Sequence, residues 1–312
     1  MFKKNRKEIS IQDRIKGSIY GFLVGDALGV PVEFLSRDEL RTKLVKDMLE
    51  YGTHNQPKGT WSDDSSMTLA TMRSIVNMKG IDYEDIMQEF CAWYQEDKYC
   101  QYFRFDIGNT TSRSLNRYLN GEEALKSGGT STHDNGNGSL MRILPLAYVP
   151  DIDYESIGNV SALTHGHDRS KIACALYVEI AKSMLESDLT IDEHIKQACD
   201  KITEYYKDNE ELENFKRIID DDFSGEIRSG GYVIDTIESV VYCLKNTSSY
   251  KDAVLKAVNL GGDTDTTAAI CGGLAGIYYG FDEIPTHWLE SIPHLDKVLS
   301  LCEEFEELYD KC

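Results

Sequence analysis

Two aspartates stand one residue apart in a segment that could bind a metal ion. Asp263 and Asp265 alternate with threonine hydroxyls, directly after the Gly261-Gly262 pair and before an apolar run with helical spacing. Carboxylate and hydroxyl oxygens suit Mg²⁺, Mn²⁺ or Ca²⁺, whereas Zn²⁺ prefers histidine and cysteine. The glycines permit a sharp turn that lets the two carboxylates converge. Capping of the following helix is the ordinary alternative, so a metal site requires a second cluster.

A second cluster of the same kind lies far earlier in the chain. Ser62, Asp63 and Asp64 precede residues 66–78, whose apolar positions have helical spacing. Together the two clusters contribute four carboxylates, which is enough to hold two divalent cations. Each cluster alone could be a helix cap, but two of them make coincidence a weaker explanation. The residues alone leave capping and a two-metal site as comparable interpretations.

Other polar residues could lie near these carboxylates. Glu33 follows a proline turn and could face a cavity, although an exposed glutamate is the ordinary interpretation. Asp106 precedes a predicted helix, where capping also explains it. The Gly- and Asn-rich loop 130–142 could surround a phosphate with backbone N–H groups, or it could simply be flexible. His165 is expected to contact a substrate or cap a helix, because 164–167 lacks the spacing of a zinc motif.

Helices must position these residues, because the alternation typical of β-strands is scarce. Apolar spacing and capping residues predict helices over 11–28, 66–78, 83–96, 110–119, 139–147, 154–163, 168–186, 191–206, 231–245, 250–259, 266–279 and 295–309. The fold class is therefore predicted to be all-α.

Two stripes of small residues predict a close contact between the first helix and a late one. The first stripe consists of glycines four residues apart, at Gly17, Gly21, Gly25 and Gly29. The second stripe consists of Ala269, Gly272, Gly273, Gly276 and Gly280. Since each helical glycine costs about 1 kcal/mol of helix propensity, we expect a helix or a ligand to approach the backbone there. Contact between the stripes would bring both aspartate clusters to one end of a bundle.

The composition bounds the class of protein. The chain of 312 residues is 41% hydrophobic and has no low-complexity linker, which predicts a single domain over 1–312. A formal net charge of −20 argues against a general nucleic-acid surface, since phosphates bind clustered Lys and Arg. No run of 18 apolar residues occurs, so a membrane span is not expected. Eight cysteines without a C-x-x-C pair predict reduced core thiols in a cytoplasmic protein.

Six motifs occur in an order that is specific in combination. They are GDALGVPVEF, GTWSDDSSM, DIGNTT, NGNGSLMRILPLA, THGHDRS and NLGGDTDTTAAICGGLAG. In this order they resemble the ADP-ribosylglycohydrolase family, which includes the dinitrogenase reductase-activating glycohydrolases and the ADP-ribosylarginine and ADP-ribosylserine hydrolases. The resemblance covers Gly17 to about Gly280. It implies a compact, all-α orthogonal bundle with a binuclear Mg²⁺ or Mn²⁺ site.

The resemblance also implies roles for residues that match the family's motifs. The metal ligands would be Ser62, Asp63, Asp64, Asp263, Asp265 and Thr266. Position 62 is usually threonine in the family, so Ser62 is a departure that keeps the hydroxyl. The catalytic acids would be Glu33 and Asp106. The substrate-binding residues would be Asn109, Asn137, Gly138, Ser139, His165, Tyr232 and Gly262. Tyr232 would stack on adenine, with a core tyrosine as the alternative.

The implied activity is hydrolysis of the bond between the distal ribose of ADP-ribose and a protein side chain, with arginine as the expected linkage. Two metal ions would orient the ribose and activate water, and ADP-ribose would be the product. The partner would be an ADP-ribosylated protein, alongside a cognate ADP-ribosyltransferase or a toxin. Two alternatives remain open. One is a non-catalytic ADP-ribose-binding protein on the same fold, and the other is a hydrolase of a different derivative, such as O-acetyl-ADP-ribose.

Overall fold

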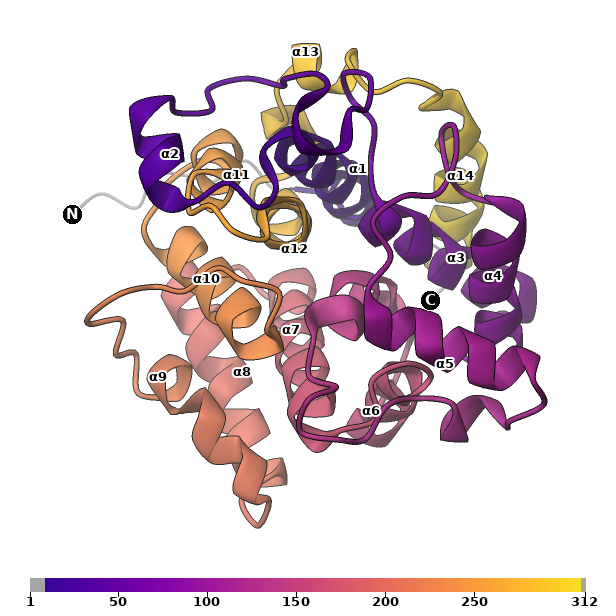
Figure 1. The fold of residues 1–312 in the computed structure, drawn as a ribbon. Helices are drawn as coiled ribbons and strands as arrows, with labels where there is room; N and C mark the ends of the chain where they lie inside the picture. The colour runs from indigo at the N-terminus through magenta and orange to yellow at the C-terminus, as the bar shows by residue number, and fades with distance from the viewer. Residues whose placement is uncertain (1–8, 310–312) are drawn as a thin grey trace.

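A computed structural model describes residues 9–309, and within this range the chain is all-α, as predicted (Figure 1). The α-helices are α1 (Ile11–Gly29), α2 (Arg37–Thr42), α3 (Asp63–Met78), α4 (Tyr83–Glu96), α5 (Asn109–Leu119), α6 (Tyr154–Ala162), α7 (Asp168–Glu186), α8 (Ile191–Tyr205), α9 (Lys216–Ile219), α10 (Val233–Lys245), α11 (Tyr250–Val258), α12 (Thr264–Tyr279), α13 (Thr286–Leu289) and α14 (Asp296–Tyr309). The 3₁₀ helices are η1 (Val30–Val32), η2 (Gly52–His54), η3 (Ala124–Lys126), η4 (Asn137–Arg142), η5 (Leu144–Tyr148), η6 (Glu210–Phe215) and η7 (Phe281–Glu283). Between residues 9 and 309, β-pairing is limited to isolated bridges.

Helices α1 and α12 lie side by side (Figure 1), and small residues form their contact, from Gly17 beside Gly276 to Gly29 beside Asp265. A Cβ at Gly25 would stand 2.1 Å from the carbonyl oxygen of Ala268. At the end of α1, a Cβ at Gly29 would stand 2.3 Å from the Cα of Asp265, near the start of α12. These distances are far below van der Waals contact, so the two backbones touch in a way that glycine permits. The predicted contact between the two small-residue stripes is confirmed, and the helices are antiparallel.

Other helices surround this pair and complete the apolar core. Helices α7, α10 and α11 pack against α12, while α3 packs against α4 and α14. Phe22, Trp93, Tyr177 and Trp288 are fully buried in the core cluster. Burial of side chains of this size is favourable by roughly 2–3 kcal/mol each. The packing holds the first turns of α3 and α12 in place.

Four segments differ from the predicted helices, and the causes are local. Residues 139–147 are divided between η4 and η5 at Ile143 and do not form one α-helix, because Pro145 lacks an N–H group and restricts the residue before it. Helix α2 was not predicted although Ser36 and Glu39 form a capping box, because six residues hardly show a period. Helices α9 and α13 have four residues each and were missed for the same reason.

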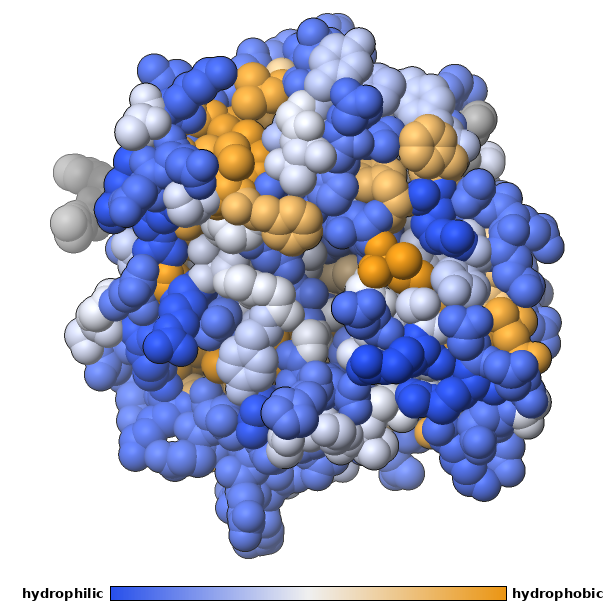
Figure 2. Space-filling view, viewed as in Figure 1, coloured by the Kyte–Doolittle hydropathy of each residue, from blue (hydrophilic) through white to orange (hydrophobic). Residues whose placement is uncertain are grey.

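The surface is mainly hydrophilic on the face shown in Figure 2, with apolar side chains gathered beside α2. A hollow next to α2 is lined by residues that include Leu40, Leu44 and Leu49. Between residues 9 and 309, no helix has the length and apolar character needed to cross a membrane. The seven cysteines from Cys91 to Cys302 are free and six are buried, as predicted, while Cys312 lies outside the described residues.

Candidate metal centre and ligand site

The first turn of α3 presents Asp63 and Asp64, and Asp26 of α1 holds that turn in place. The Asp26 carboxylate accepts hydrogen bonds from the backbone N–H of Ser62, at 2.9 Å, and of Ser65, at 3.0 Å, as well as from the Ser65 hydroxyl. Burial raises the pKa of Asp26 to about 6, and these hydrogen bonds oppose the rise. Asp26 thus accepts hydrogen bonds from N–H groups at the start of α3 that would otherwise lack a backbone partner. The aspartates in the first turn of α3 are not needed to cap these groups. The sequence predicted no role for it.

The first turn of α12 follows the Gly-Gly pair. Gly261 and Gly262 both have φ of +76°, and a Cβ at Gly262 would lie 2.4 Å from the Ser229 carbonyl oxygen. Only glycine adopts this turn without strain and without a clash. Asp263 occupies the N-cap position, yet its side chain makes no capping hydrogen bond. The capping interpretation of Asp263 is therefore wrong.

Carboxylates from both helix starts converge with one from the segment after α1. The Thr266 hydroxyl donates to Asp64 Oδ2 over 3.3 Å, which joins α12 to α3. One carboxylate oxygen from each of Glu33, Asp263 and Asp265 lies within 4.8 Å of the other two. The fold therefore assembles acids from three distant parts of the sequence at one end of the α1–α12 pair.

Ser62 has two functions at the start of α3. Its hydroxyl oxygen accepts a hydrogen bond from the backbone N–H of Asp64 at 3.3 Å, which caps the helix. The same hydroxyl donates to Asp64 Oδ2 at 3.1 Å and therefore faces the carboxylate cluster. The capping interpretation of this segment thus holds for Ser62, whereas its role as a metal ligand stays a prediction.

Three buried carboxylate oxygens in the cluster have no hydrogen-bond partner in the described part of the chain, namely Asp64 Oδ1, Asp263 Oδ1 and Asp265 Oδ2. Burial, together with the charges of neighbouring acids, raises the pKa of Asp63, Asp64 and Asp265 well above the ordinary aspartate value. Unpaired charges in a buried site are costly unless a partner neutralises them. Hard divalent cations bind such oxygens, so the donor set fits Mg²⁺ or Mn²⁺.

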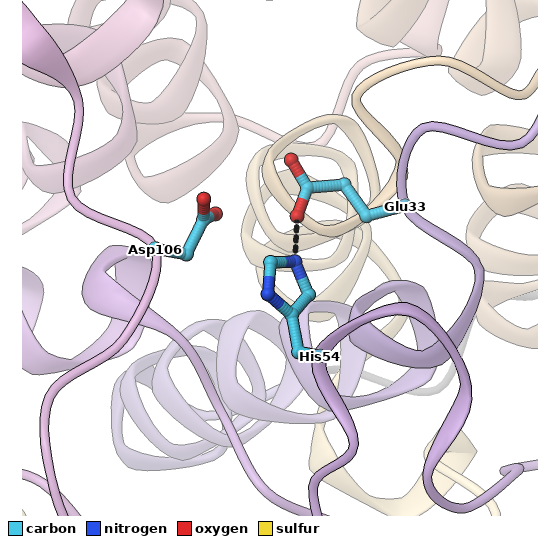
Figure 3. A group of neighbouring side chains, drawn as sticks. All are labelled: Glu33, His54 and Asp106. Carbon is cyan, nitrogen blue, oxygen red and sulfur yellow. Dashed lines mark hydrogen bonds and ion pairs between the residues drawn. The ribbon is translucent and has the colours of Figure 1, made fainter.

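Glu33, His54 and Asp106 come from three separate segments and gather at one point (Figure 3). His54 Nε2 is hydrogen-bonded to Glu33 Oε2. Burial raises the pKa of Glu33 to about 8, the hydrogen bond with His54 opposes the rise, and the charges of Asp106 and Asp263 add to it. The hydrogen bond to Glu33 also raises the pKa of His54. Both acids that the resemblance marked as catalytic therefore lie beside the carboxylate cluster.

His54, the last residue of η2, belongs to no sequence motif. Its ring stands near those of Phe34 and Phe105, with centroids 5.9 and 5.2 Å away. The preceding Thr53 hydroxyl donates to the Glu33 carbonyl oxygen at 2.7 Å, so backbone and side chain of Glu33 are both held by this short helix. A single histidine in an irregular segment forms no spacing pattern, and only its tertiary contacts reveal it.

Asn137 connects the Gly/Asn-rich loop to the carboxylates. Its side-chain amide donates to Asp263 Oδ2 at 2.9 Å and lies 3.0 Å from the Thr236 hydroxyl as a second acceptor. Its backbone N–H donates to the Gly231 carbonyl at 3.0 Å, which ties the loop to the turn that carries Tyr232. Because Asn137 engages Oδ2, the other oxygen of Asp263 is left for a different partner.

Gly138 and His165 are neighbours, whereas Ser139 turns into the core. A Cβ at Gly138 would stand 2.8 Å from His165 Cε1 and 2.9 Å from the Thr111 hydroxyl oxygen, so a larger residue would have to displace these side chains. The fully buried Ser139 hydroxyl accepts a hydrogen bond from the Ser161 hydroxyl at 2.9 Å. Burial lowers the pKa of His165 to about 3, so its imidazole is neutral.

The remaining predicted substrate residues have different surroundings. Asn109 begins α5 with an exposed side chain, three residues after Asp106. Tyr232 is half-buried at the start of α10, with the guanidinium of Arg169 centred 5.8 Å from its ring. Gly262 belongs to the turn that aims the carboxylates of α12. Their contacts with a ligand stay predictions.

Comparison with known proteins agrees with the fold and the motifs. A sequence model described as ADP-ribosylglycohydrolase matches residues 7–312. The chain is 31% identical to ADP-ribosylarginine hydrolase Tri1 of Serratia proteamaculans, over 94% of this chain and 78% of the relative. It is 30% identical to ADP-ribosyl-[dinitrogen reductase] glycohydrolase of Rhodospirillum rubrum, over 91% of both chains. A solved structure described as an ADP-ribosylglycohydrolase-related protein complex aligns with a TM-score of 0.81 and 26% identity, over 96% of this chain and 99% of that chain. These matches show that the chain belongs to the ADP-ribosylglycohydrolase family of enzymes.

Proposed function

We propose that this protein is a metal-dependent hydrolase that releases ADP-ribose from modified proteins, with ADP-ribosyl-arginine as the preferred linkage. The observation that carries the proposal is the set of three buried carboxylate oxygens, where α3 and α12 begin, that find no partner among residues 9–309. The arginine linkage is supported by two relatives named ADP-ribosylarginine hydrolase, from Serratia proteamaculans and Pseudomonas putida, at 31% and 30% identity.

Two Mg²⁺ or Mn²⁺ ions would be held by Ser62, Asp63, Asp64, Asp263, Asp265 and Thr266. When bound, such ions orient ribose hydroxyls and lower the pKa of a water molecule. Contacts within the protein hold these side chains and their helix starts in place. Asp26 fixes the first turn of α3, and Asn137 holds one oxygen of Asp263.

Glu33 and Asp106 are the acids that we propose for proton transfer. Cleavage of a glycosidic bond needs one group that protonates the leaving atom and one that accepts a proton from water. Glu33 is held at its carboxylate by His54 and at its carbonyl by Thr53. Asp106 reaches the same point from the segment before α5, where it has a left-handed φ of +52°. The two acids thus approach a common space from separate segments.

We propose that ADP-ribose lies against a second group of residues, which consists of Asn109, Asn137, Gly138, Ser139, His165, Tyr232 and Gly262. The contact between Gly138 and His165 supports this grouping, and so does the hydrogen bond from Asn137 to Asp263. Ser139 would act through its backbone, because its hydroxyl is bonded in the core. The partner would be an ADP-ribosylated protein, together with a cognate transferase or toxin.

The test is hydrolysis of ADP-ribose linked to arginine, serine, glutamate or a DNA end, in the presence of Mg²⁺ or Mn²⁺. We expect free ADP-ribose from the arginine-linked substrate and no release after exhaustive chelation. The double variant Asp63→Asn, Asp263→Asn should be inactive, while Asp208→Asn, an exposed aspartate, should behave as wild type. Activity that survives chelation would refute the proposal.

The products separate this function from its alternatives. Binding of ADP-ribose without turnover of any linkage would indicate a non-catalytic binding protein. Turnover of O-acetyl-ADP-ribose alone would indicate a hydrolase of another derivative. Release of AMP or phosphate would indicate cleavage at the diphosphate and would place the reacting atoms elsewhere in the ligand.

We also propose that residues 1–312 form one domain and that it works in the cytoplasm. The domain assignment is supported by a core cluster whose members run from Ile15 in α1 to Phe305 in α14. The location is supported by the seven cysteines between residues 9 and 309, all of them free, because reducing compartments keep thiols unpaired. The net charge of −20 supports a surface without general affinity for nucleic acid.

A further inference from the structure

Arg142, the last residue of η4, is completely buried and has no carboxylate partner in the described part of the chain. Its Nη2 donates to the Thr164 hydroxyl at 2.6 Å, and its Nη1 donates to the Val160 carbonyl at 3.3 Å. The guanidinium carbon lies 4.4 Å from the centroid of the Phe90 ring. Burial of an arginine is costly unless its N–H groups donate hydrogen bonds, and here one of the acceptors is the Thr164 hydroxyl.

The contacts of Thr164 determine the direction of its hydrogen bonds. A guanidinium can only donate, so Arg142 occupies a lone pair of the Thr164 hydroxyl. The second neighbour of that hydroxyl is His165 Nδ1, at 2.8 Å. Residues 9–309 offer the Thr164 hydroxyl no other acceptor, so its proton points to Nδ1. If Nδ1 carried a proton instead, a buried hydroxyl proton would be left without an acceptor, which is unfavourable.

The opposite edge of the His165 ring faces the Gly/Asn-rich loop. A Cβ at Gly136 would lie 3.6 Å from Nε2, and one at Gly138 would lie 2.8 Å from Cε1. The side chain is buried, and both its burial and the nearby positive charge of Arg142 lower its pKa. The imidazole is therefore neutral, and because Nδ1 accepts, its single proton belongs on Nε2.

We propose that Arg142 and Thr164 are positioning residues that hold His165 as the neutral Nε2–H tautomer, so that this nitrogen donates a hydrogen bond to an acceptor oxygen of bound ADP-ribose. The identity of the ligand rests on the proposed function, whereas the tautomer rests on the contacts above. The arrangement converts a residue that could donate or accept into one that only donates. It thereby favours a phosphate or hydroxyl oxygen over a donor group at this position.

The backbone around Thr164 is fixed without its hydroxyl. Its carbonyl accepts hydrogen bonds from the Gly129 N–H at 2.9 Å and from the Ser114 hydroxyl at 3.0 Å, and its N–H donates to the Ser161 carbonyl at 3.1 Å. Thr164→Val therefore removes the hydroxyl while it keeps the shape of the residue. Thr164→Ser restores the hydroxyl. Thr71→Val is a matched control, because Thr71 is also fully buried and, within residues 9–309, its hydroxyl bonds only the Met67 carbonyl.

The first experiment is nitrogen-15 NMR of histidine in the full-length, ligand-free protein at neutral pH, with the His165 signals assigned by their loss in His165→Gln. We expect a protonated Nε2 and an unprotonated Nδ1 in wild type, Thr164→Ser and Thr71→Val. In Thr164→Val, we expect the Nδ1–H tautomer to become populated. An Nδ1–H tautomer or an imidazolium in wild type would overturn the proposal, and so would a Thr164→Val spectrum identical to that of wild type.

The second experiment is titration calorimetry with ADP-ribose and Mg²⁺. Loss of one oriented donor should weaken binding roughly tenfold in Thr164→Val and leave Thr164→Ser and Thr71→Val close to wild type. An unchanged Kd in Thr164→Val would overturn the ligand contact. If wild type has the Nε2–H tautomer but binds no ADP-ribose, the proposed function fails while the positioning of His165 stands.

Discussion

Replacing Gly25 with alanine sets two contributions to the free energy of unfolding against each other. In a helix with open surroundings, Gly→Ala stabilises by up to about 1 kcal/mol, because alanine has the higher helix propensity. At Gly25 the new Cβ would lie 2.1 Å from the Ala268 carbonyl oxygen and 2.6 Å from its carbonyl carbon. Both are backbone atoms that cannot rotate away, so α12 would have to move by roughly 1 Å to restore an ordinary contact. Overpacking of this kind costs about 1–3 kcal/mol or more.

We therefore expect Gly25→Ala to destabilise the protein by up to about 2 kcal/mol after a propensity gain of about 1 kcal/mol is subtracted. Gly158→Ala in α6 is the matched control, because the nearest atom to its new Cβ is Lys171 Cδ, at 3.5 Å and on a flexible side chain. This control should keep or slightly raise the stability. The displacement of α12 should also lower kcat/KM, since Gly29 contacts Asp265 at the far end of the same helix contact.

The assay is urea denaturation followed by circular dichroism, with metal present and absent, together with steady-state kinetics of ADP-ribose release. The comparison between the two variants removes the common effect of helix propensity. If Gly25→Ala is as stable as Gly158→Ala, the helices do not pack as tightly as the glycine contacts indicate, and the reasoning fails.

Further predictions concern the charges and histidines of the site. Asp265→Asn should raise the melting temperature of the metal-free protein, because it removes one charge from a buried cluster. In wild type, Mg²⁺ at one hundred times its Kd should stabilise the fold by about 2.7 kcal/mol, and the variant should lose this stabilisation. A Mg²⁺ shift equal to that of Asp208→Asn would contradict the ligand role. His54→Ala should lower kcat roughly 10–100-fold with a smaller effect on the Kd of ADP-ribose, since Glu33 loses its hydrogen bond; unchanged kcat would exclude a role for His54. Because the pKa of His165 is lowered from 6.5 to about 3 on folding, only the unfolded chain binds the proton between these values, and stability is lost as the pH falls below 6.5. In urea titrations at several pH values, His165→Gln should lose up to about 1.4 kcal/mol less stability per pH unit than wild type. If the free energy of unfolding depends on pH equally in wild type and His165→Gln, a neutral His165 is refuted.

The long helices could be predicted from the sequence because their signal is local. Apolar spacing over several turns placed a helix at 11–28 and another at 266–279, and the observed α1 and α12 span Ile11–Gly29 and Thr264–Tyr279. Helices α2, α9 and α13 are too short to repeat a period, so the same reasoning missed them. Pro145 divides a segment whose apolar pattern alone predicted one helix.

The small-residue stripes carried information about tertiary structure, which local patterns rarely do. Glycines that lower helix propensity at every fourth position need a compensating contact, and the pairing of Gly25 with Ala268 is that contact. The aspartate motifs likewise identified acids that converge. Whether each residue caps a helix or faces a ligand was beyond the sequence, since the same types suit both uses. The structure shows that Ser62 caps α3, whereas the Asp263 side chain makes no capping hydrogen bond at the start of α12.

The sequence by itself determined the helical class, the contact between α1 and α12, and the acids that meet where α3 and α12 begin. Tertiary structure alone decided which groups fix those acids and which neighbours act on them. Asp26 and His54 show no spacing pattern with the residues they hold, because their partners lie on other segments. The position of the proton on His165 depends even more strongly on tertiary contacts. It depends on a hydroxyl that is also bonded to Arg142, and the direction of a hydrogen bond is set by which groups meet in space.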